Sequence, residues 1–559
     1  MPAGGAAPLY EDSRRLFGAS LWLDAAGVIL DAALDERHAE VELAAWRERL
    51  AEITAALGWR VQACARRDGP RAALAVTAPF DALFTATLVN EWAWMRAATN
   101  GVARALATTS NADELLPAEL APAVDRLRAL LVAEENPALR ALASRAAVES
   151  VPLIADDERV SVGYGAKGKS WPTRALPDPD AVAWDSLSAI PVALVTGSNG
   201  KTTTTRLVAA MLARDGHTVG FSCSDGVFIA GARVETGDWS GPDGARRVLR
   251  DPQVTAAVLE VARGGLLRRG LVVPHATAAI VTNVAEDHFG GYGIHSRADL
   301  AAVKLCVAHA LGSTGTLVLN GDDETLRATS PDRGRRLEWF SAEAPPESVP
   351  PADEMPITHG GAAAYNVMNA IGAAHVARAL GVGTESVRQT LRAFGSDNAD
   401  NPGRLERFDV GGVRVWIDYA HNPHGLAALL NACRAEARSG RLGLLLGQAG
   451  DRDNDAIRAL ARTAWTARPD CVVLKDLDGY LRGREPGEVP GLLCAELLAA
   501  GAPGEILSIV ANEVAGVRAL LDWSRAGDLL VLLVHALDAR HRAIAWLEEL
   551  RRSGWMAPD

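Results

Sequence analysis

Two glycine-rich stretches of the sequence end in Gly-Lys followed by Ser or Thr, the ending that phosphate-binding loops use. The first, residues 163–170, reads Gly-Tyr-Gly-Ala-Lys-Gly-Lys-Ser and matches the general pattern letter for letter. Pro172, Pro177 and Pro179 follow it, so a regular helix cannot begin there. Because a phosphate loop needs a helix N-terminus whose free amides face the anion, we interpret this stretch as a glycine-rich turn.

The second stretch, residues 196–203, reads Thr-Gly-Ser-Asn-Gly-Lys-Thr-Thr and lacks the first glycine of the general pattern. It follows an apolar run at 192–195 and leads into a helical run at 204–214. Lys201 can reach the β- and γ-phosphates of a nucleotide, and the Thr202 hydroxyl can bind Mg²⁺. The residues expected to contact the nucleotide here are Gly197, Ser198, Asn199, Gly200, Lys201, Thr202 and Thr203.

The composition limits the class of protein. The chain has 559 residues, 48% of them apolar, and a formal net charge of -12. An excess of acidic residues argues against a nucleic acid as the main partner. The six cysteines are scattered, no signal peptide is recognisable, and no apolar run is long enough to span a membrane. We therefore expect a cytoplasmic protein of three or four domains, and a homo-oligomer is left open.

The elements that must position these residues fall into three regions. Residues 1–188 carry long helical patterns at 39–57, 82–106 and 117–148 and a strand-like run at 73–76, which indicates an α+β domain. Its end, at 172–180, is rich in Pro and Asp and is typical of a linker.

In residues 189–401 and again in 402–559, short apolar runs alternate with helical segments, which is typical of parallel sheets covered on both faces. The polar stretch 395–402 separates the two regions. We predict an α/β chain of three domains, with a central phosphate-loop ATPase domain on a mostly parallel sheet and a Rossmann-like C-terminal domain. The runs expected to form strands are 192–195, 256–259, 278–281, 316–319, 413–417, 442–446, 471–474 and 529–533.

Further polar residues follow the second loop in a fixed order. They are Glu260 at the end of an apolar run, Thr282-Asn283, Asp287-His288, Lys304 on a helix, Asn320-Gly-Asp322-Asp323, Asn366 with Asn369, Arg404, and Asp418-Tyr-Ala-His421-Asn422-Pro423. Together with the loop, this series resembles the signature of the Mur ligase superfamily, the ATP-dependent amide ligases of peptidoglycan precursors and folylpolyglutamate.

Within that superfamily the sequence most resembles the ligase half of the cyanophycin synthetases. The similar stretches are 237–242, 260–271, 450–452 and 482–488, and residues 13–18 faintly resemble the start of those enzymes. Cyanophycin synthetases also carry an ATP-grasp module, which this chain is too short to contain. The resemblance therefore implies only one of their two ligation activities, and it leaves open whether the product is related to cyanophycin.

The resemblance implies that ATP phosphorylates a carboxylate and that an amine attacks the acyl phosphate. It assigns catalytic roles to Lys201, Glu260, His288, Lys304 and Arg404. Thr202 and Glu260 would hold one Mg²⁺ and His288 a second. Lys304 resembles a lysine that many members carry as a carbamate; the alternative is a solvated lysine on a helix surface. Ordinary strand-end, loop and helix-surface roles remain the alternatives for Glu260, His288 and the asparagines.

The remaining roles concern ligands. Nucleotide contacts are implied for Asn283, Asn366, Asn369, Arg404, Asp418 and His421, where His421 either stacks on the base or only shapes its turn. Candidate substrate residues are Arg263, Gly264, Gly265 and Arg268 in a glycine-rich loop, and Asp451, Arg452, Arg482, Arg484 and Glu488 in the last domain. The expected partners are an amino acid and an acidic amino-acid or peptide acceptor. A cell-wall or polyglutamate-type acceptor, a kinase and a non-catalytic ATP-binding scaffold are the alternatives.

Overall fold

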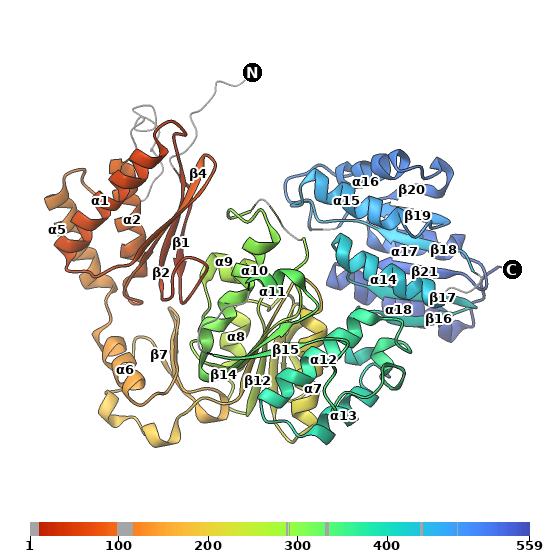
Figure 1. The fold of residues 1–559 in the computed structure, drawn as a ribbon, viewed down its shortest axis with the longest axis horizontal. Helices are drawn as coiled ribbons and strands as arrows, with labels where there is room; N and C mark the ends of the chain where they lie inside the picture. Colours follow the sequence, from red (N-terminus) through yellow and green to blue (C-terminus); the bar gives the residue numbers. More distant parts are fainter. Residues whose placement is uncertain are drawn as a thin grey trace.

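The computed structural model describes residues 10–97, 116–286, 289, 291–329, 335–436, 440–477 and 479–558. They form four β-sheets with helices packed against them, and the predicted α/β class is confirmed. The N-terminal sheet and the C-terminal domain lie on opposite sides of the central domain (Figure 1). Within the described part of the chain, no helix is both long and apolar enough to cross a membrane. The exact domain limits at 188/189 and 401/402 stay a prediction.

The N-terminal region begins with an antiparallel sheet whose apolar face is covered by helices. Its strands, in spatial order, are β1 (Tyr10–Leu16), β2 (Gly27–Ala33), β4 (Arg71–Thr77) and β3 (Ala63–Asp68). The covering helices are α1 (Ala39–Leu57), α2 (Leu83–Ala97) and α5 (Leu120–Glu134). Trp46 is fully buried there and its Nε1 donates to Asn90 Oδ1 at 2.9 Å.

The helix predicted over 117–148 is two helices, which corrects the sequence interpretation. α5 ends at Glu134, and α6 (Pro137–Val148) starts again with Asn136 as its N-cap. The Asn136 side chain accepts from Leu139 N at 3.0 Å, and Pro137 lacks the amide that a continuous helix would need. The C-terminal end of the helix predicted over 82–106 lies outside the described residues.

A small separate sheet connects the N-terminal region to the central domain. It contains β5 (Leu153–Ala155), β6 (Arg159–Val162) and β7 (Lys169–Pro172). The literal phosphate-loop pattern at 163–170 forms the turn between β6 and β7, and no α-helix follows it. The interpretation of this stretch as a glycine-rich turn is therefore confirmed.

The central domain is built on an eight-stranded sheet. Its order is β11 (Ala232–Thr236), β10 (Gly226–Ile229), β9 (Val219–Cys223), β12 (Ala256–Glu260), β8 (Val192–Thr196), β13 (Ala276–Val281), β14 (Leu311–Asn320) and β15 (Arg336–Phe340). The strands from β9 to β15 pair in parallel, and β10 and β11 add antiparallel strands at one edge.

Both faces of this sheet are buried because its strands are apolar at consecutive positions. In β8, for example, Val192 and Leu194 face one cluster while Ala193 and Val195 face the other. One face packs on α8 (Pro242–Leu249), α9 (Arg263–Arg269), α10 (Arg297–Leu305) and α11 (Glu324–Thr329). The other packs on α7 (Lys201–Arg214), α12 (Ala364–Ala379) and α13 (Thr384–Ala393).

The C-terminal domain repeats this arrangement on six strands. Their order is β16 (Glu406–Val410), β17 (Val413–Asp418), β21 (Leu529–Leu533), β18 (Leu442–Leu446), β19 (Cys471–Lys475) and β20 (Leu507–Val510), all parallel except β16. The helices are α14 (Pro423–Glu436), α15 (Asn454–Trp465) and α16 (Glu488–Ala499) on one face, and α17 (Glu513–Trp523) and α18 (Leu537–Ser553) on the other.

Candidate functional site

The loop at 197–200 connects buried strand β8 to helix α7, as the sequence predicts for a phosphate loop. Two glycines are required by its path. Gly197 has φ +152°, and a Cβ there would lie 1.8 Å from Thr282 Oγ1. Gly200 has φ +81°, and its Cβ would lie 2.2 Å from Asn369 Oδ1. Only residues without a side chain fit these two positions, so the backbone of the loop stays exposed to the adjoining cavity.

The loop is fixed from behind by the end of β13. Asn283 accepts from Asn199 N through its Oδ1 at 3.0 Å and donates to Asn199 O at 3.0 Å. Thr282 Oγ1 donates to Asn199 O at 2.6 Å. Lys201 opens α7 and its Nζ lies 3.1 Å from Ser198 O, over the loop. The amides of Ser198 and Asn199 thus hold the loop against Asn283, which leaves the first amides of helix α7 and the Lys201 ammonium group for a phosphate.

A hydroxyl and a carboxylate meet beside the loop. Thr202 Oγ1 donates to Glu260 Oε2 at 2.9 Å, and Glu260 ends β12 with only 3% of its surface exposed. Burial raises the pKa of Glu260, although Lys201 and the Thr202 hydroxyl act against that rise. A cation bound between these oxygens would stabilise the ionised carboxylate, and hard oxygen donors are what Mg²⁺ takes.

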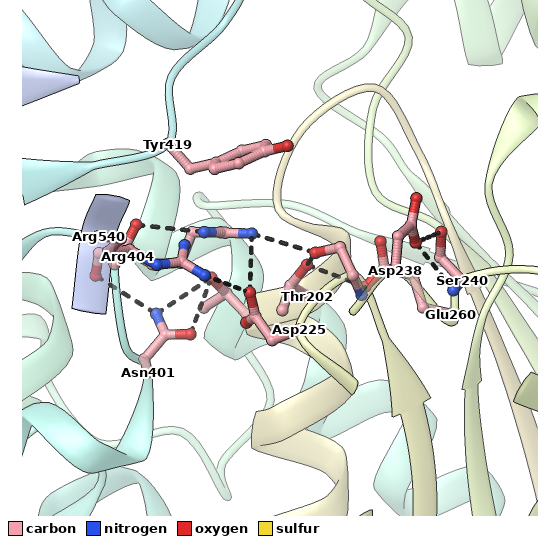
Figure 2. Close-up of polar contacts among 12 residues, drawn as sticks. Thr202, Asp225, Asp238, Ser240, Glu260, Asn401, Arg404, Tyr419 and Arg540 are labelled. Carbon is pink, nitrogen blue, oxygen red and sulfur yellow. Dashed lines mark hydrogen bonds and ion pairs between the residues drawn. The ribbon is translucent and has the colours of Figure 1, made fainter. Parts of the chain in front are cut away.

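Arg404 enters the same cavity from the C-terminal domain (Figure 2). Its Nη2 donates to Ser224 Oγ at 3.2 Å, and Ser224 Oγ lies 3.1 Å from Thr202 Oγ1. The guanidinium carbon of Arg404 lies 4.2 Å from the centre of the Tyr419 ring. Ser224 thus links Arg404 to the hydroxyl of Thr202, the second residue of α7.

A buried carboxylate, Asp225, is surrounded by three arginines, of which Figure 2 labels Arg404 and Arg540. Arg540 on α18 donates to it at 2.7 Å, Arg206 on α7 at 3.4 Å, and Arg404 lies 4.0 Å away. Burial alone would raise the pKa of Asp225, but these three cations overcome it and lower the pKa to about 2. Asp225 is therefore ionised at neutral pH and joins the central and C-terminal domains.

The two domains also meet at the loop itself. Asn422 Nδ2 donates to Asn199 Oδ1 at 2.9 Å, and Asn199 Nδ2 lies 3.1 Å from His424 Nδ1. Nearby, Asn401 Nδ2 donates to Thr203 Oγ1 at 3.2 Å. The cavity between the domains has a volume of about 560 Å³ and contains Lys201 and Arg404 in its lining. That volume is in the range of small-ligand sites.

The lining of the cavity also contains four other predicted nucleotide residues. They are Asn366, Asn369, Asp418 and His421. Asn369 Nδ2 donates to Asn366 Oδ1 at 3.1 Å, so the two lie on one face of α12. Both oxygens of Asp418 accept backbone amides, from Leu405 at 2.8 Å and Ala420 at 2.7 Å. Asp418 therefore shapes the β17 turn in addition to facing the cavity.

The remaining predicted catalytic residues are His288 and Lys304. His288 and the neighbouring Asp287 are outside the described residues. Lys304 lies on α10, as predicted, but only 3% of its surface is exposed. The alternative of a solvated surface lysine is therefore wrong, because burial removes it from water.

The first group of predicted substrate residues sits on a helix, which corrects the expectation of a glycine-rich loop. Residues 263–269 form α9, which begins shortly after strand β12 ends at Glu260. Arg268 Nε donates to Gly264 O at 3.3 Å, so its guanidinium folds back over its own helix. Arg263, Gly264, Gly265 and Arg268 do not line the 560 Å³ cavity among the described residues.

The second group forms its own cluster in the C-terminal domain. Arg484 donates to Gly450 O at 2.8 Å, Arg452 O at 2.7 Å and Glu488 at 2.5 Å, and Arg452 donates to Asp451 at 3.2 Å. The Arg482 guanidinium lies 5.3 Å from the centre of the Tyr480 ring. The structure brings Asp451, Arg452, Arg484 and Glu488 together, outside the lining of the 560 Å³ cavity.

Several residues at the site were missed by the sequence analysis: Ser224, Asp225, Arg540, Tyr419 and His424.

Beneath Tyr419, a fully buried Lys475 donates to Glu513 at 2.6 Å, and its Nζ lies 3.2 Å from His535 Nδ1. Burial, helped by Lys475, lowers the pKa of His535 to about 4. His535 is therefore neutral, accepts at Nδ1 and donates through Nε2 to Ala420 O at 3.1 Å. This network holds the turn that carries Tyr419.

Comparisons with known proteins place the chain in a family. The Mur ligase middle domain matches residues 195–377, and the Mur ligase glutamate ligase domain matches residues 403–533. The UDP-N-acetylmuramoyl-L-alanyl-D-glutamate–2,6-diaminopimelate ligase of Corynebacterium efficiens is 30% identical over 374 residues, covering 60% of this chain and 68% of that enzyme. The chain belongs to the Mur ligase family. The resemblance stated from the motifs is thereby confirmed.

Other members of the Mur ligase family match only in part. The cyanophycin synthetase of Synechocystis sp. is 34% identical over 380 residues, which is 63% of this chain but 43% of that enzyme. The chain thus spans less than half the length of the curated cyanophycin synthetases that it matches. A solved folylpolyglutamate synthase of Mycobacterium tuberculosis in complex with ADP covers 64% of this chain and 90% of its own, with 18% identity and a TM-score of 0.48.

Proposed function

We propose that this protein is an ATP-dependent ligase that phosphorylates an acceptor carboxylate and joins it to the amine of an amino acid, releasing ADP and phosphate. The acceptor would be an acidic amino acid or peptide, in a cyanophycin-like peptide metabolism. Family membership supports the ligase class, and the similarity to the cyanophycin synthetases supports the choice of substrates.

One observation carries the proposal. Lys201 of the central domain and Arg404 of the C-terminal domain face the same 560 Å³ cavity, with the Thr202–Glu260 pair beside them. Phosphoryl transfer needs the γ-phosphate positioned and its developing charge neutralised, more than it needs covalent help from the protein. Two cations from different domains meet that need when the domains are closed.

Thr202 and Glu260 supply two hard oxygen donors, so they fit a first Mg²⁺. Mg²⁺ would neutralise the charge on the β- and γ-phosphates. His288 is our candidate for a second metal beside the acceptor. Among the described residues there is no group of three His, Cys, Asp or Glu side chains that could hold a metal. Phosphate oxygens and water would therefore complete the coordination.

A cell-wall precursor is the second candidate acceptor. The observation that favours it is the 29% identity over 376 residues to the diaminopimelate ligase of Corynebacterium glutamicum. The polyglutamate-type acceptor is a variant of the same chemistry. A non-catalytic scaffold is less well supported, because Lys201, Thr202, Glu260 and Arg404 are all present around one cavity. A kinase would use the same residues, and the amine dependence of ADP release separates it from a ligase.

The test is a phosphate-release screen of the purified protein with ATP, Mg²⁺ and pairs of amino acids with short acidic peptides. We expect ADP release that depends on the amine, and a new amide bond in the product identified by mass spectrometry. Full-rate ADP release without an amine would indicate a kinase. A product formed only with a muropeptide precursor would indicate the cell-wall alternative, and no release with any pair would leave the scaffold.

Lys304 provides a separate prediction, because an unmodified cation would repel a metal and a carbamate would attract one. Labelled bicarbonate is expected to give a carbamate carbon signal in the NMR spectrum of the wild type and none in Lys304→Ala. The variant should lose activity about 10–100-fold, as supporting groups of metal sites do, and chloride should restore part of it. An identical spectrum for both proteins would exclude the carbamate. Lys167→Ala, which removes an exposed lysine, is the matched control.

A further inference from the structure

A second hollow, of about 600 Å³, lies where the β6–β7 sheet meets helix α8. Five of its lining side chains are cationic, and they are Arg159, Lys169, Arg246, Arg247 and Arg250. Only two acidic side chains line it, Asp156 and Asp243. None of these residues lines the nucleotide cavity. The hollow therefore has a surplus of positive charge and is a separate site.

Two of the arginines are occupied in holding the hollow together. Arg250 donates to Asp156 at 2.6 Å, to Ser161 Oγ at 2.9 Å and to Arg159 O at 3.0 Å, which ties α8 to strand β6. Arg247 donates to Asp251 at 3.1 Å. All three guanidinium nitrogens of Arg250 are hydrogen-bonded, so Arg250 builds the wall of the hollow, and Arg247 adds one ion pair to it.

The other three cations keep donor capacity. Arg246 is 8% exposed, and its Nη1 donates to Asp243 at 3.0 Å. Its buried Nη2 and Nε have no hydrogen-bond partner in the described part of the chain, and Nε is 3.8 Å from Asp156, too far for a hydrogen bond. Arg159 and Lys169 are exposed and form no ion pair with any described residue. Arg246 also lies over the Phe17 ring, 5.1 Å from its centre, but that contact accepts no hydrogen bond in the plane of the guanidinium. Buried N–H groups without an acceptor are costly, so a ligand that accepts from Nε and Nη2 would be stabilising.

Two glycines in the turn that precedes Lys169 determine where this lysine lies. Gly163 has φ +71° and Gly165 has φ +55°, and a Cβ at either would lie 2.2 Å from a backbone oxygen, that of Lys167 or Val254. These glycines bend the chain so that Lys169 and Ser170 reach the hollow. The literal phosphate-loop pattern thus places its Gly-Lys-Ser ending on the hollow, although no α-helix follows it.

We propose that this hollow is a second anion site, which binds a dianionic oxyanion, either a phosphate or a dicarboxylate, between Lys169, Arg159 and Arg246. Guanidinium groups recognise both anions through paired hydrogen bonds, and the ammonium group adds a point charge. The site is independent of the proposed ligase reaction, since it shares no lining residue with the nucleotide cavity.

The test is equilibrium dialysis of the full-length protein against radiolabelled inorganic phosphate at low ionic strength, with ADP and Mg²⁺ present in excess. We expect one equivalent of bound phosphate. The double variant Arg159→Gln/Lys169→Gln should weaken this binding at least tenfold. Lys167→Gln, in the same turn but outside the lining, should leave it unchanged. The same titration with Lys201→Ala should keep the equivalent, which excludes the phosphate loop as its source.

A parallel arm with labelled succinate distinguishes the two anions. Tighter binding of succinate, lost in the double variant, would support the site with a carboxylate ligand. Binding of either anion that survives the double variant, or no binding of either, would overturn the proposal. Both substituted side chains are exposed, so the variants are expected to fold, and circular dichroism checks this.

Discussion

Replacing Lys201 by alanine is expected to slow turnover about 10²–10³-fold, the usual cost of removing one preorganised charge that stabilises a transition state. Lys201 starts α7 at the loop and its Nζ lies over Ser198 O, 3.1 Å away. The side chain fills no apolar core, so the free energy of unfolding should change little. The measurement is amine-dependent ADP release at saturating ATP, with thermal unfolding recorded in parallel.

The matched control comes from the other Gly-Lys-containing stretch. Lys167→Ala alters the pattern at 163–170 but removes an exposed side chain that lines neither cavity. It should retain the activity of the wild type. Near-normal ADP release by Lys201→Ala would place the reaction elsewhere in the molecule.

Asp225→Asn is expected to produce the largest loss of stability. The change leaves Arg206, Arg404 and Arg540 without their shared counter-charge in a buried place, and breaking such a pair costs about 3–5 kcal/mol. Turnover should also fall, since Arg404 loses one of its anchors. Urea unfolding followed by tryptophan fluorescence measures the first effect, and ADP release measures the second.

The free energy of unfolding should depend on pH, and the direction of that dependence follows from the pKa of Asp225. The pKa of Asp225 is lowered from 3.8 to about 2, so the ionised form stabilises the folded protein at all pH values above about 4. That contribution, about 2 kcal/mol from the shift alone, is lost as the pH falls from about 4 to about 2. The stability difference between wild type and Asp225→Asn should therefore shrink over that range.

Asp455→Asn is the control for Asp225→Asn. Asp455 also pairs with an arginine, Arg458, at 3.1 Å, but 93% of its own side chain and 40% of the Arg458 side chain are exposed. Exposed pairs contribute about 0–1 kcal/mol, so this variant should unfold near the wild type. Equal destabilisation by the two substitutions would show that the three-arginine cluster does not join the domains.

The sequence predicts well where local patterns determine the structure. Strand β8, the loop after it and helix α7 follow from an apolar run, a Gly-rich turn and a helical run in succession. The sequence fails where one residue overrides a pattern, as Pro137 does when it divides α5 from α6. The glycines of residues 263–269 also led to the prediction of a loop, whereas these residues form α9, which packs on one face of the sheet.

Long-range contacts could not be predicted from one sequence. Asp225 and Arg540 are 315 positions apart, and nothing in the Ser-Asp-Gly turn around Asp225 distinguishes it from an ordinary hairpin turn. Lys475 lies in an apolar strand, where its pairing with Glu513 depends on a helix that follows 38 residues later. Charges that meet only after the domains fold have no local signature.

The segment from Tyr164 to Ser188 begins and ends at one place. Tyr164 N donates to Ser188 O at 3.0 Å, and Ser188 N donates to Lys167 O at 3.0 Å. Because the segment enters and leaves at one place, its exposed turn at residues 174–175, beyond strand β7, can be lengthened with little effect on the β-sheets. We would therefore insert a guest protein, such as a fluorescent reporter, at this exposed turn and expect both proteins to fold.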